Sequence, residues 1–386
     1  MNDATAIPFF SGAASARRDR AALEAMVRQV AASGRFTSGP VTAELEAAIA
    51  ARTGARHAVA VANGTDALVI LLRAAGIGPG DEVIVPAYTF FATASCVLHV
   101  GAEPVLVDVL PGSYAMDPQR AEAAITERTK AIMPVHLFSQ MADMEVLKDL
   151  ADRHGLLLLE DSAEGIDMRA GGVHAGLWGS GGVLSFFPTK TLGSLGDAGM
   201  LLTDDDGIAA SARRLRLHGQ GTDGAYATDG AYVYQELGYN SRCDELQSAF
   251  LLHRLERLSE ETGRRAELAA RYDRLLAPLA RTVTTPWMAP AKSPSNQVYY
   301  VYLIECDRRD ELAAYLEAHG VGTEAYYPRP LTEQPLLAPL PGSRHPVPVS
   351  EAAARRALAL PLYPDLTDQQ ADRVAALVHA FYGAAS

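Results

Sequence analysis

The feature that most constrains this fold is a series of short apolar segments that alternate with helical patterns. Seven of the segments read as strands: His57–Ala62, Glu82–Pro86, Pro104–Val107, Ala131–Val135, Leu156–Asp161, Gly182–Phe187 and Met200–Thr203. Most are continuously apolar, as expected for strands that are covered on both faces. Helical patterns such as Asp66–Ala75 and Met144–His154 separate several of them. The sequence therefore predicts an α/β fold built on a mainly parallel, doubly wound sheet of seven strands.

The chain on either side of these strands predicts an arm and a second, smaller domain. Helical spacing is seen before the sheet at Ala21–Ser33 and Val41–Arg52, and after it at Glu245–Leu276 with an interruption at Gly263. Beyond a Pro- and Ser-rich linker, Thr284–Asn296, come a strand pattern and two helical patterns: Val298–Cys306, Arg309–His319 and Gln369–Tyr382. We expect residues 1–250 to form an N-terminal arm and the large domain. We expect residues 251–386 to form a long linking helix and a small C-terminal α/β domain.

Composition excludes several classes of function. The net charge of −12 over 386 residues argues against non-specific binding to nucleic acid or to an anionic membrane. Cys96, Cys243 and Cys306 are widely separated, so we expect reduced thiols rather than a disulfide framework. Residues 1–20 hold no apolar segment of signal-peptide length, and no apolar run approaches the roughly 20 residues of a membrane helix. These observations predict a soluble, cytoplasmic protein.

Lys190 and Asp161 carry the strongest chemical signal, because each lies at the end of an expected strand. Ligands of doubly wound sheets bind at the carboxyl ends of strands. An amine and a carboxylate placed there suit pyridoxal phosphate: the amine forms a Schiff base with the cofactor aldehyde, and the carboxylate keeps the pyridine nitrogen protonated. The alternatives are a solvated loop lysine and a carboxylate that simply caps the next helix. Against the first, Lys190 is the sole lysine between Lys148 and Lys292, and glycines surround it on both sides.

Other segments fit the same chemistry but leave alternatives open. Asn63–Leu68 follows the first strand and opens a helix that Thr65 or Asp66 can cap. The free amides at the start of this helix can attract a phosphate. An ordinary helix cap without a ligand explains the segment equally well. Phe90 follows the second strand and could lie flat on a pyridine ring or pack in the core. Arg242 and Asp244 precede the long helix and could simply pair with each other.

Competing motifs are absent from the sequence. There is no GxSxG, no HExxH and no paired Cys/His spacing, so we expect neither a serine hydrolase nor a metal site. The glycines at 176–182 precede a strand, whereas a dinucleotide-binding turn follows one. Four scattered histidines are expected to be structural: His136, His154, His174 and His253.

Taken in order, these segments resemble the DegT/DnrJ/EryC1/StrS family of sugar aminotransferases, which depend on pyridoxal phosphate and have fold type I. The resemblance runs from about Gly39 to the C-terminus. Six motifs carry it: Asn63–Leu68, Asp81–Pro86, Glu160–Ala163, Ser185–Gly199, Gly238–Glu245 and Tyr326–Leu331. Each motif alone is modest evidence, but six in this order are specific.

The resemblance implies roles for the cofactor site. Lys190 and Asp161 are implied to be the catalytic pair: Lys190 bonds the cofactor and moves the proton, while Asp161 bonds the pyridine nitrogen. Phe90 is implied to stack on the ring. Backbone amides of Gly64, Thr65 and Asp66, with the Ser185 hydroxyl, are implied to hold the phosphate. The cofactor is implied to cycle through pyridoxamine phosphate.

The resemblance also implies contacts with substrate and with a second subunit. Asn240 would reach the phosphate of the neighbouring subunit's cofactor, which implies a homodimer with shared active sites. Arg242 is implied to bind the carboxylate of the amino-acid donor. Tyr326 and Arg329 are implied to contact the sugar or diphosphate of a nucleotide-sugar substrate.

Two positions depart from the family pattern. The family usually has Gln or His where this chain has Glu164, a position that approaches the phenolic oxygen of the cofactor. An ionised carboxylate there would repel that oxygen, so Glu164 is protonated, turned away or functionally distinct. The family usually has a His after the Pro–Leu of its C-terminal motif, where this chain has Thr332.

The sequence therefore predicts an aminotransferase that moves an amino group from an amino-acid donor, expected to be L-glutamate, to a nucleotide-linked (dTDP-type) keto-deoxysugar. Lys190 separates this reading from related sugar dehydratases, which carry a His at that position. Two alternatives are an aminotransferase for a keto-cyclitol and a cofactor-binding regulatory protein without turnover. No DNA-binding segment is visible to support the second alternative.

Overall fold

A seven-stranded sheet lies at the centre of the large domain. The computed structural model describes residues 6–220, 233–293 and 295–383. The strands are β1 (His57–Val61), β2 (Glu82–Pro86), β3 (Glu103–Val107), β4 (Thr129–Ile132), β5 (Leu157–Asp161), β8 (Gly181–Ser185) and β9 (Gly199–Thr203). Their order is β1-β9-β8-β5-β4-β2-β3, and only β9 runs antiparallel to its neighbours. The predicted α/β fold with a mainly parallel seven-stranded sheet is confirmed.

β1 and β8 end slightly earlier than the sequence predicts, and β4 differs most. β4 ends at Ile132, whereas apolar character continues to Val135. Pro134 has no N–H to donate to a neighbouring strand, which interrupts regular pairing at this point. The ladder resumes only as a single bridge between Val135 and Asp161.

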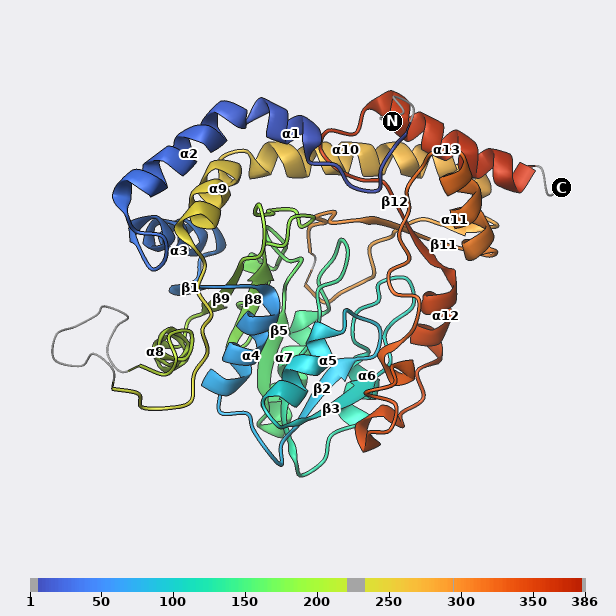
Figure 1. The fold of residues 1–386 in the computed structure, drawn as a ribbon. Helices are drawn as coiled ribbons and strands as arrows, with labels where there is room; N and C mark the ends of the chain where they lie inside the picture. The colour runs from blue at the N-terminus through green and yellow to red at the C-terminus, as the bar shows by residue number, and fades with distance from the viewer. Residues whose placement is uncertain (1–5, 221–232, 294, 384–386) are drawn as a thin grey trace.

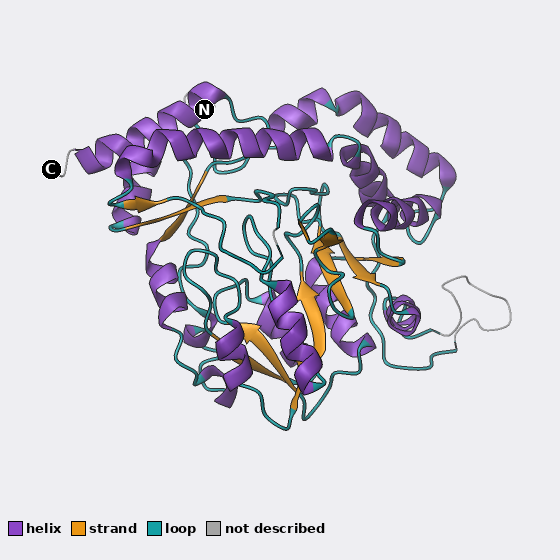
Figure 2. Cartoon of the chain, turned by 180° about the vertical axis from the view of Figure 1, so that it is seen from behind, coloured by secondary structure: helices purple, strands orange, loops and turns teal. Residues whose placement is uncertain are grey.

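Helices cover both faces of the large sheet (Figures 1 and 2). The helices around the sheet are α3 (Pro40–Thr53), α4 (Gly64–Ala74), α5 (Ala92–His99), α6 (Pro118–Ala123), α7 (Met144–His154) and α8 (Asp206–Leu215), and they are preceded in the N-terminal arm by α1 (Ala13–Arg18) and α2 (Arg20–Ser33). Alternate residues of β2 point to opposite sides: Val83 and Val85 pack with Leu68 of α4, while Ile84 packs with Leu147 of α7. Because both faces are buried, the strands are apolar throughout, which is why the sequence revealed them so clearly.

The long helical pattern after residue 245 forms two helices, α9 (Glu245–Leu255) and α10 (Leu258–Leu276). The prediction of a break at Gly263 is therefore wrong. Gly263 lies on the exposed side of α10, where a glycine costs only about 1 kcal/mol relative to alanine and does not end a helix. The break falls at Glu256 and Arg257, where the Arg257 N–H bonds the Arg254 carbonyl in a tight turn.

A small antiparallel sheet follows, in the order β10-β11-β12. Its elements are β10 (Val283–Thr284), β11 (Tyr302–Cys306), β12 (Ala357–Leu360), α11 (Arg309–Ala318), α12 (Pro348–Arg356) and α13 (Asp368–Gly383), with short 3₁₀ turns at Ala277–Leu279, Leu331–Glu333 and Pro341–Ser343. Tyr272, Tyr302 and Val374 form its core, and Ile7 from the N-terminal segment packs into the same cluster. The proposed division at residue 250 falls inside α9.

The long helices gather on one side of the molecule. α1, α2, α10 and α13 lie along the top of Figure 1 and remain there in the opposite view of Figure 2, with the large sheet below them. A two-stranded hairpin, β6 (Arg169–Ala170) and β7 (Val173–His174), follows β5. Within the described residues, no helix combines the length and apolar character needed to cross a membrane.

Candidate active site

A cavity of about 770 Å³ lies where several strands of the large sheet end. Its floor comes from residues that follow β1, β2, β5 and β8, and its other wall comes from Tyr300, Tyr326 and Tyr327 near the small sheet. Both Lys190 and Asp161 line it. The carboxyl ends of the strands thus form a ligand-sized space, as the topology predicts.

Lys190 reaches this cavity from the turn after β8. Its Nζ donates a hydrogen bond to Oε1 of Glu164 at 2.9 Å and lies 4.2 Å from the centre of the Tyr300 ring. The other carboxylate oxygen of Glu164 accepts the Phe138 N–H at 2.7 Å. Glu164 therefore faces the lysine, with one hydrogen bond on each oxygen, as suits an ionised carboxylate.

Asp161 is the last residue of β5 and is buried. Its Oδ2 accepts a hydrogen bond from the Thr93 hydroxyl at 2.7 Å, and its Oδ1 accepts the Ala163 N–H at 3.2 Å. Thr93 in turn contacts the Thr89 hydroxyl at 3.1 Å. These contacts fix the carboxylate at the cavity wall. The sequence analysis did not identify Thr93, although it lies only three residues after Phe90.

The turn between β1 and α4 forms a cradle for an anion. Asn63 caps the helix, because its side chain accepts the Asp66 N–H at 2.7 Å. The prediction that Thr65 or Asp66 is the cap is therefore wrong. Asn63 immediately precedes the first residue of α4, and from there its side-chain oxygen reaches the N–H of the third helical residue, Asp66. Gly64 and Thr65 lie in the first turn, where amides lack partners within the helix and attract anions.

Ser185 closes the cradle from the end of β8. A Cβ atom at Gly64 would lie 2.9 Å from Cβ of Ser185 and 3.2 Å from its hydroxyl oxygen, so only glycine allows this approach. A Cβ at Gly199 would come within 2.4 Å of the Asn63 carbonyl carbon. Two glycines thus bring β8, β9 and the α4 turn together around the same small space.

Aromatic side chains form the rest of the wall. Phe90 lines the cavity and is 58% exposed, with its ring centre 6.2 Å from that of Tyr327. Burial, reinforced by the Glu164 carboxylate, raises the pKa of both Tyr300 and Tyr327 above the ordinary phenol value. Burial also raises the pKa of Tyr326. These phenols are therefore neutral hydrogen-bonding groups in the physiological pH range.

Three of the sequence-predicted residues do not line this cavity: Asn240, Arg242 and Arg329. Asn240 is exposed and forms a β-bridge with Leu217. Arg329 is also exposed. Arg242 is half-buried, and its Nε has no hydrogen-bond partner within the described part of the chain.

His136 and Glu160 support the site from behind. His136 is fully buried and shares a hydrogen bond of 2.9 Å with Glu160. Glu160 also accepts the N–H groups of Gly176, Trp178 and Gly179. These bonds join neighbouring segments of the large domain, but His136 also lines the cavity, so its structural role stays a prediction. In the described ranges, no three or more His, Cys, Asp or Glu side chains are grouped so that they could hold a metal ion.

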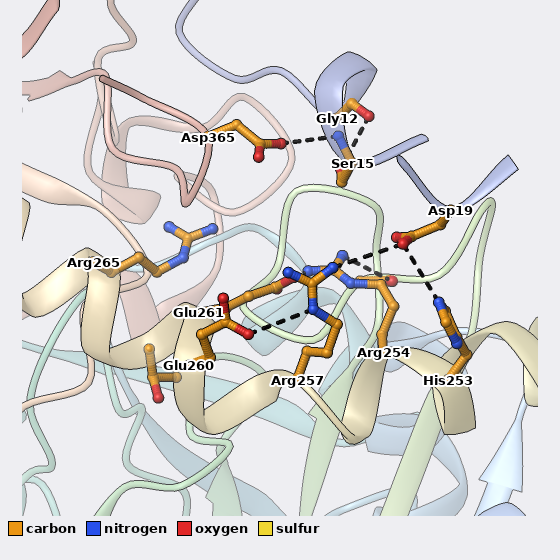
Figure 3. Close-up of polar contacts among 12 residues, drawn as sticks. Gly12, Ser15, Asp19, His253, Arg254, Arg257, Glu260, Glu261, Arg265 and Asp365 are labelled. Atoms are coloured by element: carbon orange, nitrogen blue, oxygen red, sulfur yellow. Dashed lines mark hydrogen bonds and ion pairs between the residues drawn. The ribbon is translucent and has the colours of Figure 1, made fainter. Parts of the chain in front are cut away.

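A second, smaller cavity of about 190 Å³ lies on the other side of the Lys190 turn, between the N-terminal segment and α10. Figure 3 shows its charged side chains. Asp19 lies 3.6 Å from both His253 and Arg257, and Arg254 pairs with Glu261. Asp19, at the start of α2, thus contacts the end of α9 and the turn that follows it, and the Arg254–Glu261 pair joins α9 to α10.

The donor set of the larger cavity fits pyridoxal phosphate. It combines an amine for the aldehyde, a buried and firmly held carboxylate for the pyridine nitrogen, and a glycine-lined helix start for the phosphate. The three buried cysteines are free thiols, as expected.

Comparison with known proteins agrees with this geometry. The chain matches the model of the DegT/DnrJ/EryC1/StrS aminotransferase family over residues 17–379. It is 43% identical over 355 residues to a pleiotropic regulatory protein from Geobacillus stearothermophilus, covering 92% of each chain. It is 39% identical over 344 residues to a UDP-2-acetamido-2-deoxy-3-oxo-D-glucuronate aminotransferase from Pseudomonas aeruginosa, covering 89% of this chain and 91% of that one.

Two further comparisons involve Streptomyces venezuelae. The chain is 40% identical over 368 residues to its dTDP-3-amino-3,4,6-trideoxy-alpha-D-glucose transaminase, covering 95% of this chain and 94% of that one. The crystal structure of DesV from the same organism, in complex with a ketimine intermediate, has a TM-score of 0.90 at 39% identity. The match covers 97% of this chain and 98% of DesV. By its sequence, fold and site, this chain belongs to the DegT/DnrJ/EryC1/StrS aminotransferase family and is a pyridoxal-phosphate-dependent aminotransferase of fold type I.

Proposed function

We propose that the protein moves an amino group from an amino-acid donor, expected to be L-glutamate, to a nucleotide-linked keto-deoxysugar of the dTDP type. The observation that carries this proposal is the meeting of Lys190, Asp161 and the α4 helix start in one cavity. Relatives whose names specify dTDP- and UDP-linked sugars support a nucleotide-sugar substrate. The product would be an amino sugar for natural-product or glycan biosynthesis.

Within this proposal, this chain's own residues divide the work of holding the cofactor. Lys190 would hold the cofactor through its aldehyde, and Asp161 would accept a hydrogen bond from the protonated pyridine nitrogen. Phe90 covers one face of the ring. The Gly64 and Thr65 amides and the Ser185 hydroxyl hold the phosphate; the Asp66 amide is already bonded to Asn63.

The chemistry follows from what these residues do. When bound, pyridoxal phosphate supplies an aldehyde that reacts with amines and a ring that accepts the electron pair of a substrate C–H bond. Lys190 carries the proton between the substrate carbon and the cofactor. Asp161, fixed by Thr93, keeps the pyridine nitrogen protonated and so keeps the ring electron-poor. The neutral phenols of Tyr300, Tyr326 and Tyr327 line the side from which a sugar would approach.

A homodimer with shared sites is part of the proposal. Asn240 is exposed and does not line its own chain's cavity, which supports a contact with the cofactor phosphate of a partner subunit. Arg242 lies two residues further on, and its buried, unpartnered Nε among the described residues supports a role in binding the donor carboxylate. Tyr326 and Arg329 are proposed contacts for the sugar or diphosphate.

Two other functions remain as alternatives from the sequence. The first is an aminotransferase for a keto-cyclitol, which would use the same amine chemistry. A substrate screen separates this function from amination of a nucleotide sugar. A regulatory protein that binds the cofactor without turnover matches the name of the Geobacillus relative. The intact pair of Lys190 and Asp161 in one cavity favours catalysis over that reading.

The test begins with Lys190→Ala. This variant is expected to lose the visible absorbance of the lysine-bound cofactor and the complete transamination cycle, because no other lysine of the described residues lines the cavity. Lys148→Ala, which removes an exposed lysine of α7, is the control and keeps both. Full activity in Lys190→Ala would refute the assignment of Lys190.

The substrate is identified by a half-reaction. The wild-type protein is loaded with pyridoxamine phosphate and mixed with nucleotide-linked 3-keto and 4-keto sugars, and with a keto-cyclitol. The correct acceptor is expected to restore the absorbance of the aldehyde form of the cofactor. A response to the cyclitol alone would replace the nucleotide-sugar proposal.

A further inference from the structure

Glu164 is the ionisable residue of the cavity whose role the family pattern does not supply. Its side chain is only 5% exposed, and that of Lys190 is 16% exposed. The two side chains meet at 2.9 Å, in a part of the cavity from which solvent is largely excluded. An ion pair is stronger in such surroundings than at the surface.

The position of Glu164 is fixed from its second oxygen. The Phe138 N–H that it accepts belongs to a residue with φ of 66°, a left-handed conformation that residues with side chains rarely adopt. The Tyr300 N–H holds the Phe138 carbonyl at 2.8 Å, and the Phe138 ring is inclined by 30° to that of Tyr327 with centres 6.3 Å apart. Strain of this kind persists where the surroundings enforce it, commonly at functional sites.

No other acid in the described cavity bonds the lysine. Asp161 is occupied by Thr93 and Ala163, and Glu324 and Asp197 are exposed on the cavity rim. The groups that face the pair from the opposite wall are the phenols of three residues, which burial keeps neutral: Tyr300, Tyr326 and Tyr327.

We propose that Glu164 is a positioning residue for the reacting nitrogen of Lys190: its carboxylate holds that nitrogen in place and stabilises a positive charge on it. This proposal rests on the proposed role of Lys190 as the cofactor lysine.

The test is a spectroscopic pH titration of protein reconstituted with pyridoxal phosphate. Glu164→Gln keeps the size of the side chain and an oxygen for the Phe138 N–H but removes the charge. It is expected to lower the pH midpoint of the visible absorbance change by about one unit or more, because the positive charge on the linked nitrogen loses its partner. Its kcat is expected to fall about 10-fold with KM changed less than about 2-fold.

Two further variants make the result specific. Glu164→Asp keeps the charge but draws it back by one methylene, so its midpoint should lie between those of wild type and Glu164→Gln; it also carries the test if Glu164→Gln does not fold. Glu82→Gln removes a buried carboxylate, paired with Arg128, at the opposite end of β2, and should keep the wild-type midpoint.

The outcomes separate the two levels of the proposal. Absence of a lysine-dependent visible absorbance in the wild-type protein would overturn the role of Lys190 and with it the proposed function. A normal absorbance whose pH midpoint is the same in wild type, Glu164→Gln and Glu164→Asp would overturn the role of Glu164 alone.

Discussion

At the scale of single residues, chemistry could be read from the sequence where residue type and strand position coincide. Lys190 and Asp161 were identified because a lone lysine and an acid each follow an apolar strand. Thr93 was not, because a threonine in the first helical turn has many ordinary roles. Its importance comes only from the 2.7 Å contact with Asp161.

This contact gives a prediction at the same scale. Asp161→Asn is expected to lower kcat by about 100-fold or more, since an amide cannot stabilise a protonated pyridine nitrogen as a carboxylate does. Thr93→Val removes only the hydroxyl that orients Asp161, so a loss of about 10-fold is expected. Steady-state kinetics with the accepted sugar measure both. Thr53→Val, a buried threonine of α3 bonded to the Ile49 carbonyl, is the control and should leave kcat unchanged.

At the scale of elements, His174 ties together the segment that runs from β5 to β7 and contains Glu164. His174 of β7 accepts the Asp167 N–H at its Nε2 and contacts the Ala175 carbonyl through its Nδ1. Asp167 in turn pairs with Arg52 of α3. A neutral imidazole is required, since one ring nitrogen must accept and the other must donate. Burial lowers the pKa of His174 from 6.5 to about 4.

The stability of this protein should therefore depend on His174 in mild acid. The unfolded chain binds a proton at His174 near its ordinary pKa of 6.5, whereas the folded chain does so only at about 4. The free energy of unfolding should therefore fall by about 3 kcal/mol as pH falls through that window. Urea unfolding of wild type and His174→Gln over this pH range measures the effect.

The variant should be less stable at neutral pH and should show a shallower loss in acid. His154→Gln, at the exposed end of α7, is the control and should keep the wild-type slope. Identical pH slopes for His174→Gln and wild type would contradict this account.

At the scale of the whole molecule, the cavity needs distant parts of the chain. Its floor comes from the large sheet, and its opposite wall comes from Tyr300 and Tyr326. The fully buried Arg265 of α10 ties this wall in place, since it donates to the carbonyls of Tyr300 at 2.9 Å and Leu362 at 2.7 Å. The proposed partner subunit would complete the site with Asn240.

Mixed dimers test this last proposal. When Lys190→Ala and Asn240→Ala subunits are combined at random, half of the dimers should contain one subunit of each kind. If Asn240 acts across the interface, each of these mixed dimers should contain one undamaged site. Activity should then recover to about a quarter of the wild-type value, although neither variant alone approaches it. If Asn240 served its own subunit, every site would carry a lesion and mixing would restore nothing.

The sequence by itself determined the α/β class, the seven strands of the large sheet and the Lys190–Asp161 pair. Strands buried on both faces must be apolar along their whole length, so they are visible without knowledge of their neighbours. The sequence analysis was wrong where competing local interactions decide the outcome. The cap of α4 is Asn63, the end of β4 is set by Pro134, and Gly263 does not interrupt α10.

Only the tertiary structure decided which groups meet. The sequence left three possibilities for Glu164, and the fold places the Phe138 N–H on one side of its carboxylate and Lys190 on the other. Such contacts join segments 26 residues apart on either side, and they depend on strand order and on the strained turn at Phe138. A pattern along the chain records which residues can be buried, whereas the partner of a buried charge is fixed by the packing of the whole fold.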